Sequence, residues 1–156
     1  MSTFKDGRKK GYYWESLLKI KDIVDRLSLD MNYNTEKEFE DRIAGALQPN
    51  FDDFIDQRNT KQTMTRVTLF DHDHRPDLSI GEDGIAIEVK LAKSGESFRS
   101  AIGQSLIYRM GYRFSLVIWI DTSKNKRYVN SVKDKKHKEK EFSLALEQQN
   151  IFSIIK

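Results

Sequence analysis

The sequence predicts an α/β fold in which helices flank a mixed central β-sheet. The chain has 156 residues, the size of one ordinary domain. Segments whose apolar residues recur at helical spacing come before, between and after short apolar or alternating segments typical of strands. No internal repeat, low-complexity tract or flexible linker divides the chain. We therefore predict one domain over residues 1–156, with residues 1–33 as an N-terminal helical extension and the order ααβββαβαβ.

Two helices are predicted first. From residue 12 to about residue 30, apolar residues recur at helical spacing with charged residues between them. The second helix covers residues 35–48 and buries a stripe that includes Phe39 and Ile43. Asn34 or Thr35 can cap its N-terminus, and a proline follows its end.

Three strands are then predicted to form a meander. Residues 51–62 have no periodicity and are predicted as a connection. Residues 64–70 alternate and are rich in β-branched side chains, which favours a strand. Residues 77–80 form a short second strand, and a turn with two glycines leads into a third over residues 85–91.

The remaining segments predict helix, strand, helix and strand. The first of these helices covers residues 97–112, and residues 114–120 form a continuous apolar run, typical of a strand covered on both faces. A last helix is predicted over residues 133–149 and a closing strand over residues 151–155. The predicted apolar sides of the two helices consist of Phe98, Ile102, Leu106 and Met110 in the first, and Phe142, Ala145 and Leu146 in the second.

Composition excludes several classes of site. The chain has no cysteine, which rules out disulfides, thiolate zinc sites and cysteine nucleophiles. It has no apolar run of signal-peptide or membrane-spanning length, so we expect a soluble, cytoplasmic protein without a membrane partner. The net charge of +3, from 27 basic and 24 acidic residues, is too small to indicate an anionic partner by itself.

The third predicted strand carries charge inside an apolar run. Because side chains alternate along a strand, Glu88 and Lys90 share one face with Ala86. Asp77 and Ser79 lie on the polar side of the preceding strand. If the turn pairs the two strands, Asp77 and Glu88 approach each other, and such a pair of carboxylates needs a cation or a proton.

These residues resemble the signature of the PD-(D/E)xK nuclease superfamily: Pro76-Asp77, ten further residues, then Glu88-Val89-Lys90. The order of the elements also resembles the restriction-endonuclease-like core of that superfamily. The resemblance implies a Mg²⁺ cofactor, for which Mn²⁺ can substitute, held by Asp77, Glu88 and the backbone carbonyl of Val89. It implies that Lys90 orients the attacking water.

The same resemblance implies a further glutamate on the helix upstream. Glu36 and Glu40 lie on one face of the predicted helix with Ile43, whereas Glu38 is rotated toward solvent. We take Glu40 as the catalytic glutamate and keep Glu36 as the alternative.

A second resemblance lies on the helix that follows the signature. Gln104 and Tyr108 form a Gln-x-x-x-Tyr pair similar to a motif of the RecB-like branch. At positions i and i+4 they project together, and we expect them to contact nucleic acid together with Arg99. The alternative is that both side chains only pack at an interface.

The segment over residues 123–140 has eight Lys or Arg residues against two acidic residues. We expect Lys133 and Lys136 to contact phosphates. The alternative is a solvated helix face, in which case the nucleic-acid path would run along Arg99, Arg109 and the helix of Gln104 and Tyr108.

The resulting expectation is a Mg²⁺-dependent phosphodiesterase that cleaves nucleic acid, with DNA favoured over RNA. A ribonuclease and a non-catalytic binding or interaction module with the same fold stay open as alternatives. The sequence leaves open whether cleavage is internal or terminal, what sequence it prefers, and whether the chain joins a homo-oligomer or a larger defence or repair assembly.

Overall fold

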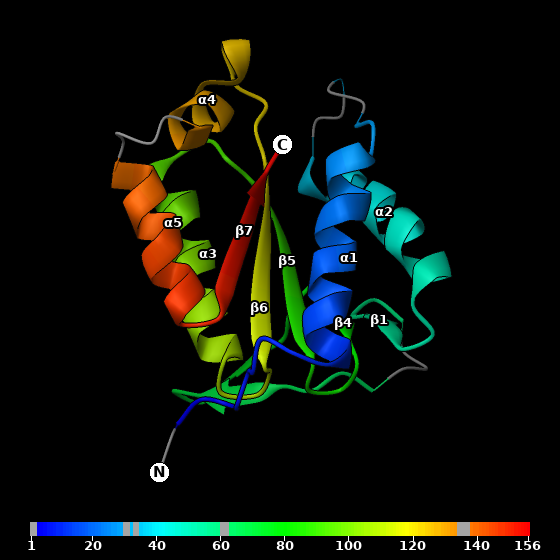
Figure 1. Cartoon of the computed structure of the whole chain (residues 1–156). Helices are drawn as coiled ribbons and strands as arrows, with labels where there is room; N and C mark the ends of the chain where they lie inside the picture. Colours follow the sequence, from blue (N-terminus) through cyan, green and yellow to red (C-terminus); the bar gives the residue numbers. More distant parts are fainter. Residues whose placement is uncertain (1–2, 30–31, 33–34, 60–62, 134–137) are drawn as a thin grey trace.

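The protein has a mixed central β-sheet with helices on both faces (Figure 1). The computed structural model describes residues 3–29, 32, 35–59, 63–133 and 138–156. The sheet has the strand order β1-β4-β5-β6-β7. Its strands are β1 (Phe54–Asp56), β4 (Leu78–Ile80), β5 (Ile85–Leu91), β6 (Phe114–Ile120) and β7 (Ile151–Ile155). The pairs β1–β4 and β4–β5 are antiparallel and the pairs β5–β6 and β6–β7 are parallel, so the predicted mixed sheet is confirmed.

The helices form two layers, as Figure 1 shows. One face of the sheet is covered by α1 (Tyr12–Arg26) and α2 (Glu36–Leu47). The other face is covered by α3 (Gly95–Tyr108), α4 (Arg127–Lys133) and α5 (Lys138–Gln148). Two short 3-10 turns lie at Gln48–Asn50 and Lys124–Lys126. No helix in the described ranges is long and apolar enough to cross a membrane.

The alternation predicted for β5 is confirmed. Ile85, Ile87, Val89 and Leu91 belong to the main core under α1 and α2. Ala86 faces the other way and packs with Tyr108 and Tyr112. Every residue of β6 is buried, as expected for a strand covered on both faces. At the start of α2, the Thr35 side chain accepts a hydrogen bond from the backbone N–H of Glu38; Asn34, the other candidate cap, lies outside the described residues.

The predicted meander is wrong in its first strand. Residues 67–69 form β2 (Val67–Leu69), which pairs with β3 (His72–His74) in a separate two-stranded hairpin. The two residues between them, Phe70 and Asp71, have φ angles of 55° and 60°, which is the backbone of a tight hairpin turn. β1, in the stretch predicted as a connection, takes the place beside β4 because Phe54 and Ile55 bury there.

The predicted helix over residues 133–149 is also wrong in its extent. The chain becomes helical at Arg127, six residues earlier, because Asp121 accepts hydrogen bonds from the backbone N–H groups of Tyr128 and Val129, both at 2.9 Å. α4 ends at Lys133 and α5 begins at Lys138, and residues 134–137 lie outside the described residues.

The apolar sides predicted for α3 and α5 need correction. The buried residues of α3 are Ala101, Ser105 and Tyr108, while Leu106 is exposed and Met110 lies beyond the end of the helix. α5 has no buried residue, and Phe142 is 51% exposed, because a cavity lies between this helix and the sheet.

Asp121 is expected to be important for stability. It is fully buried and also accepts hydrogen bonds from the N–H and hydroxyl of Ser123. Burial acts to raise its pKa, but the hydrogen bonds outweigh it, so the pKa lies below the ordinary value. We expect Asp121→Ala to lower the free energy of unfolding by about 2–3 kcal/mol at pH 7, measured by urea denaturation, because several donors lose their acceptor.

The control is Thr122→Ala, which removes a neighbouring exposed side chain and is expected to leave stability unchanged. A carboxyl with a lowered pKa stabilises the fold above its unfolded pKa and loses that effect as the pH falls through its folded pKa. The difference between Asp121→Ala and the parent protein should therefore shrink below about pH 4. Equal losses in the two variants would contradict the capping role.

Candidate functional site

The candidate site lies beside β5, just before the first residue of β4. The last pair between these strands is Leu78 with Ile87, whereas β5 continues to Leu91 and stays paired with β6. On the side of β4, the edge of β5 beyond Ile87 therefore has no neighbouring strand among the described residues. We call this opening the fork. Backbone N–H groups on an open edge need other acceptors.

Carboxylates occupy the fork. Asp77 Oδ2 accepts a hydrogen bond of 2.9 Å from the backbone N–H of Val89. Glu36 Oε1, which comes from α2, accepts one of 3.1 Å from the N–H of Leu91. As predicted from the strand register, Asp77 approaches the strand that carries Glu88. A side chain that directly precedes β4 and one from α2 thus cap backbone N–H groups at the open edge of β5.

Glu88 lies under α3 on the face of β5 opposite the main core. It is only 5% exposed. The hydroxyl of Tyr108 lies 3.0 Å from Glu88 Oε2 and also 3.0 Å from the carbonyl oxygen of Arg75. One hydroxyl proton serves these two acceptors in turn. Lys90 Nζ lies 4.0 Å from Glu88 Oε1, so Glu88 and Lys90 share a face as the alternation predicts.

The site carries more negative than positive charge. Burial, followed by the charge of Asp77, raises the pKa of Glu88 to about 8. Burial and then Asp77 also raise the pKa of Glu40 to about 7. Burial raises the pKa of Asp77 despite the hydrogen bond from Val89. Lys90 does not offset these effects, so the group is poised to take up a proton or a cation.

Both candidate glutamates of α2 lie near Asp77. Glu36 reaches the edge of β5 directly, and its charge acts on Asp77. Glu40 interacts electrostatically with Asp77 and lies 3.6 Å from Arg58 Nε. The structure therefore brings the chosen residue and its alternative to one place. We call Glu36, Glu40, Asp77, Glu88 and Lys90 together the acidic site.

Arg58 is a neighbour of the acidic site that sequence reasoning missed. It follows β1 and forms ion pairs with Asp56, Asp41 and Glu40. Because residues 51–62 were predicted only as a connection, no sequence signal placed this guanidinium beside α2. Its ion pairs with Glu40 and Asp41 hold the segment after β1 against α2.

The donors in the fork fit Mg²⁺. This ion prefers oxygen ligands, and it is commonly bound by one or two carboxylates while keeping several waters. Asp77 and Glu88 provide the carboxylates. The N–H and C=O of one strand residue point to the same edge, so the carbonyl of Val89 faces the fork with its N–H. Within the described ranges no group of three or more His, Cys, Asp or Glu side chains is placed to hold a metal ion, so a bound ion would depend on water or substrate for its remaining ligands.

The residues predicted to contact nucleic acid differ in their exposure to solvent. Tyr108 is 2% exposed and lies against Glu88, so its hydroxyl supports that carboxylate and is not open to a nucleic acid. Gln104, one turn earlier, has a buried Oε1 with no hydrogen-bond partner in the described structure. Arg99 and Lys133 are exposed, and Lys136 lies outside the described residues.

Arg109 is not available as an alternative path for nucleic acid. It is 3% exposed, and its guanidinium donates hydrogen bonds to the carbonyl oxygens of Lys5, Tyr112 and Gln149. These acceptors come from three distant parts of the chain. Arg109 therefore joins the N-terminal segment to the end of α5, and the alternative path is corrected to exclude it.

Comparisons with protein-family models, with curated proteins and with solved structures find no match to this chain. The geometry of the acidic site and the pattern of its residues are therefore the grounds on which a function can be argued.

Proposed function

We propose that this chain is a Mg²⁺-dependent nuclease of the PD-(D/E)xK type, with a restriction-endonuclease-like core, and that DNA is its substrate. The observation that carries the proposal is the fork. Asp77, Glu88 and Lys90 have the spacing of the signature, and Asp77 interacts electrostatically both with Glu88 and Lys90 of β5 and with Glu36 and Glu40 of α2. A cross-strand salt bridge on a solvated face would not require a buried Glu88 or the helix carboxylates.

Each residue has a defined task in this proposal. Asp77, Glu88 and the carbonyl of Val89 would hold the cation. Glu40 or Glu36 would add a further negative charge beside it. When bound, Mg²⁺ lowers the pKa of a coordinated water and offsets charge on the phosphate. Lys90 lies on the same face as Glu88, where its ammonium can orient the attacking water and stabilise the charge that develops on the phosphate.

Tyr108 has a positioning task. Its hydroxyl fixes one carboxylate oxygen of Glu88 and leaves the other, Oε1, on the side of Lys90. Such outer partners hold a metal-binding carboxylate in one orientation. In this proposal the tyrosine of the Gln-x-x-x-Tyr pair positions Glu88 inside the protein and does not contact nucleic acid.

The proposal predicts cleavage that depends on a divalent cation. Labelled single-stranded, duplex and branched DNA, and single-stranded RNA, would be incubated with the protein in Mg²⁺, Mn²⁺ or EDTA and resolved on a gel. We expect cleavage of at least one DNA substrate in Mg²⁺ or Mn²⁺ and none in EDTA, because the water lacks an activator without the cation.

Glu88→Gln, purified in parallel, controls for a contaminating nuclease, which would cut equally in both preparations. Cleavage of RNA alone would redirect the proposal to a ribonuclease. Binding of DNA without cleavage in either cation would favour the non-catalytic module and overturn the enzymatic assignment.

A further inference from the structure

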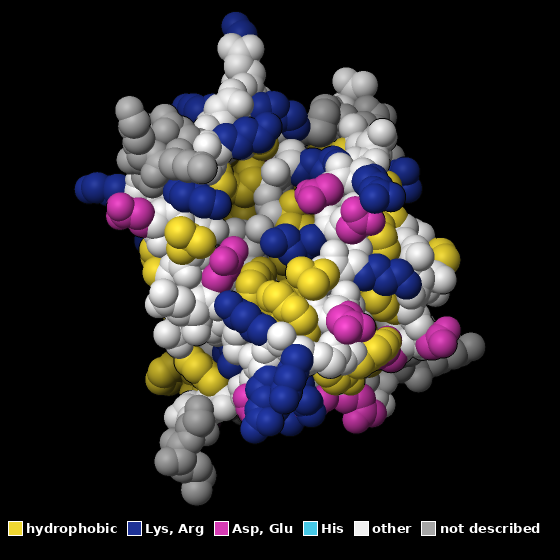
Figure 2. Space-filling model, viewed as in Figure 1, with side chains coloured by type: hydrophobic (Ala, Val, Ile, Leu, Met, Phe, Trp, Pro, Cys, Tyr) yellow, Lys and Arg dark blue, Asp and Glu magenta, His cyan; other side chains and the backbone are white. Residues whose placement is uncertain are grey.

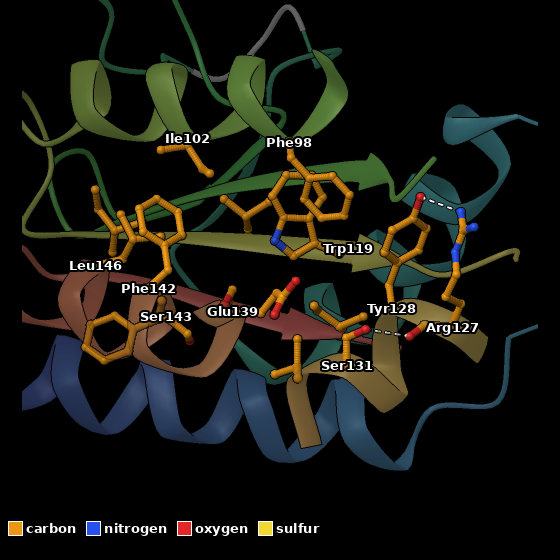
Figure 3. A pocket seen from close by; sticks show the side chains of 16 residues that line it. Phe98, Ile102, Trp119, Arg127, Tyr128, Ser131, Glu139, Phe142, Ser143 and Leu146 are labelled. Carbon is orange, nitrogen blue, oxygen red and sulfur yellow. Dashed lines mark hydrogen bonds between the residues drawn. The ribbon is translucent and has the colours of Figure 1, made fainter. Parts of the chain in front are cut away.

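A cavity lies on the same face of the sheet as Glu88 and Lys90, between the sheet and helices α3, α4 and α5 (Figure 3). Its volume is about 210 Å³. A single water needs roughly 10–15 Å³ measured in the same way, so this space is large enough for a small organic group. Its main walls are made by Phe98, Ile102, Trp119, Tyr128, Phe142 and Leu146. We call it the aromatic cavity.

One side of the aromatic cavity is a cluster of rings. The ring centroids of Phe98 and Trp119 are 4.5 Å apart, and those of Phe98 and Tyr128 are 5.2 Å apart. Phe142 and Leu146 from α5 line the cavity as well, as Figure 3 shows. Flat aromatic groups stack favourably against such rings, so the walls suit a planar ligand.

The aromatic cavity also contains a hydrogen-bond donor without an acceptor. Trp119 is 4% exposed and lines the cavity, and its indole N–H has no hydrogen-bond partner among the described residues. Figure 3 shows the nitrogen on the side of the ring that faces the cavity. This N–H is not among the buried, unsatisfied polar atoms of the described structure, so water can reach it, and an acceptor on a ligand would take the place of that water. The preferred ligand is therefore planar and carries an acceptor on its edge.

Cations lie at the rim of the aromatic cavity. The guanidinium of Arg127 lies 4.8 Å from the ring centroid of Tyr128 and donates a hydrogen bond to its hydroxyl. Figure 2 shows further Lys and Arg side chains gathered around α4. Glu139 also lines the cavity, so a ligand phosphate would lie on the side of Arg127, outside the cavity.

The aromatic cavity begins one strand away from Lys90. Lys90 of β5 and Trp119 of β6 are register partners in the parallel pair, so their side chains leave the same face of the sheet. Neighbouring strands are about 4.8 Å apart. A nucleic-acid strand with one phosphate at Lys90 would thus have an adjacent nucleotide within reach of Trp119.

We propose that the aromatic cavity holds one nucleobase of the substrate, taken out of its stack, beside the phosphodiester presented to the acidic site. This inference rests on the proposed function. A nucleobase has two flat faces for the rings, acceptors on its edge for the Trp119 N–H, and a phosphate for Arg127. Substrates whose bases leave the stack easily, such as single strands, frayed ends and mismatches, are then preferred over intact duplex.

The first test uses Trp119 as the reporter. The chain has two tryptophans, and Trp14 packs on the opposite face of the sheet against Phe114 and Phe152. In a Trp14→Phe protein with EDTA, we expect thymidine monophosphate to quench the remaining fluorescence saturably and deoxyribose 5-phosphate to leave it unchanged. Equal responses to the two probes would overturn the proposal. Saturable binding of an anilinonaphthalene sulfonate dye without any response to the nucleotide would also overturn it, in favour of an apolar docking surface.

The second test compares a labelled single-stranded oligonucleotide with the same strand made fully abasic, by fluorescence anisotropy in EDTA. We expect the intact strand to bind the parent protein about 10-fold more tightly, since base stacking on aromatic side chains has effects of this order. Trp119→Phe, which keeps a ring but lacks the N–H, and Phe98→Leu should each reduce that ratio. Leu106→Ala, on the exposed side of α3, is the matched control and should keep it.

Equal binding of both strands by the parent protein would overturn the base pocket even if DNA is cleaved. A base-dependent ratio that both cavity variants reduce, in a protein that cleaves nothing, would support the pocket while the proposed nuclease function fails. If Trp119→Phe does not fold, Phe98→Leu decides, and an unchanged ratio in Phe98→Leu would place base recognition elsewhere.

Discussion

Asp77→Asn and Glu88→Gln are each expected to lower Mg²⁺-dependent cleavage of DNA at least about 100-fold, because several kcal/mol of metal-derived stabilisation would be lost. Both changes replace a charged oxygen by an amide of the same shape. Asparagine at position 77 can still accept from the N–H of Val89, and glutamine at position 88 can still accept from Tyr108. Neither change opens an apolar cavity, so the fold should be retained.

The measurement is the single-turnover cleavage rate, with circular dichroism recorded on the same preparations. Glu82→Gln is the matched control, because it makes the same chemical change in the exposed turn between β4 and β5, a few residues from the fork. Its rate should equal that of the parent protein. Full activity in both Asp77→Asn and Glu88→Gln would remove the acidic site from the reaction.

The part of the site that lies on β5 could be predicted from the sequence because strand geometry is strict. A period of two puts Glu88 and Lys90 on one face whatever surrounds the strand, and a short turn between two strands sets their register. That register places Asp77 at the level of Glu88. Helical periodicity likewise brings Glu36 and Glu40 to one face of α2, and the structure has both near Asp77.

Other features depend on tertiary contacts that leave no periodic signal. β1 has three residues, too few for a pattern, and it becomes a strand only by pairing with β4. Arg58 follows it and could not be placed for the same reason. Tyr108 was expected at a nucleic-acid surface, but the sheet buries it because Ala86 on β5 leaves room for its ring.

The aromatic cavity was also beyond sequence reasoning. Phe98, Trp119 and Tyr128 come from α3, β6 and α4, and only their packing makes one wall. The apolar residues of α5 were predicted to anchor that helix, as a helix stripe usually does. In the structure Phe142 and Leu146 instead line a space between the helix and the sheet.

The lead in melting temperature that the two amide variants hold over the parent protein should shrink when a divalent cation is added. In EDTA at pH 8, we expect Glu88→Gln and Asp77→Asn to melt above the parent protein. Burial and mutual repulsion raise the pKa values of both carboxyls, which means that the ionised groups cost free energy in the folded state. A neutral amide removes that cost, on the order of 1–3 kcal/mol for Glu88.

With Mg²⁺ at about ten times its dissociation constant, linkage should stabilise the parent protein by about 1.4 kcal/mol, or roughly 3–6 °C for a chain of this size. The amide variants lack a charged ligand and should respond much less, while the exposed control Glu82→Gln should respond like the parent protein. Differential scanning fluorimetry across a Mg²⁺ and Mn²⁺ series measures all four proteins together. If the melting temperature of the parent protein ignores both cations, the buried carboxylates hold no metal. The repulsion at the fork would then be relieved by protons alone, as expected for a binding module that does not cut.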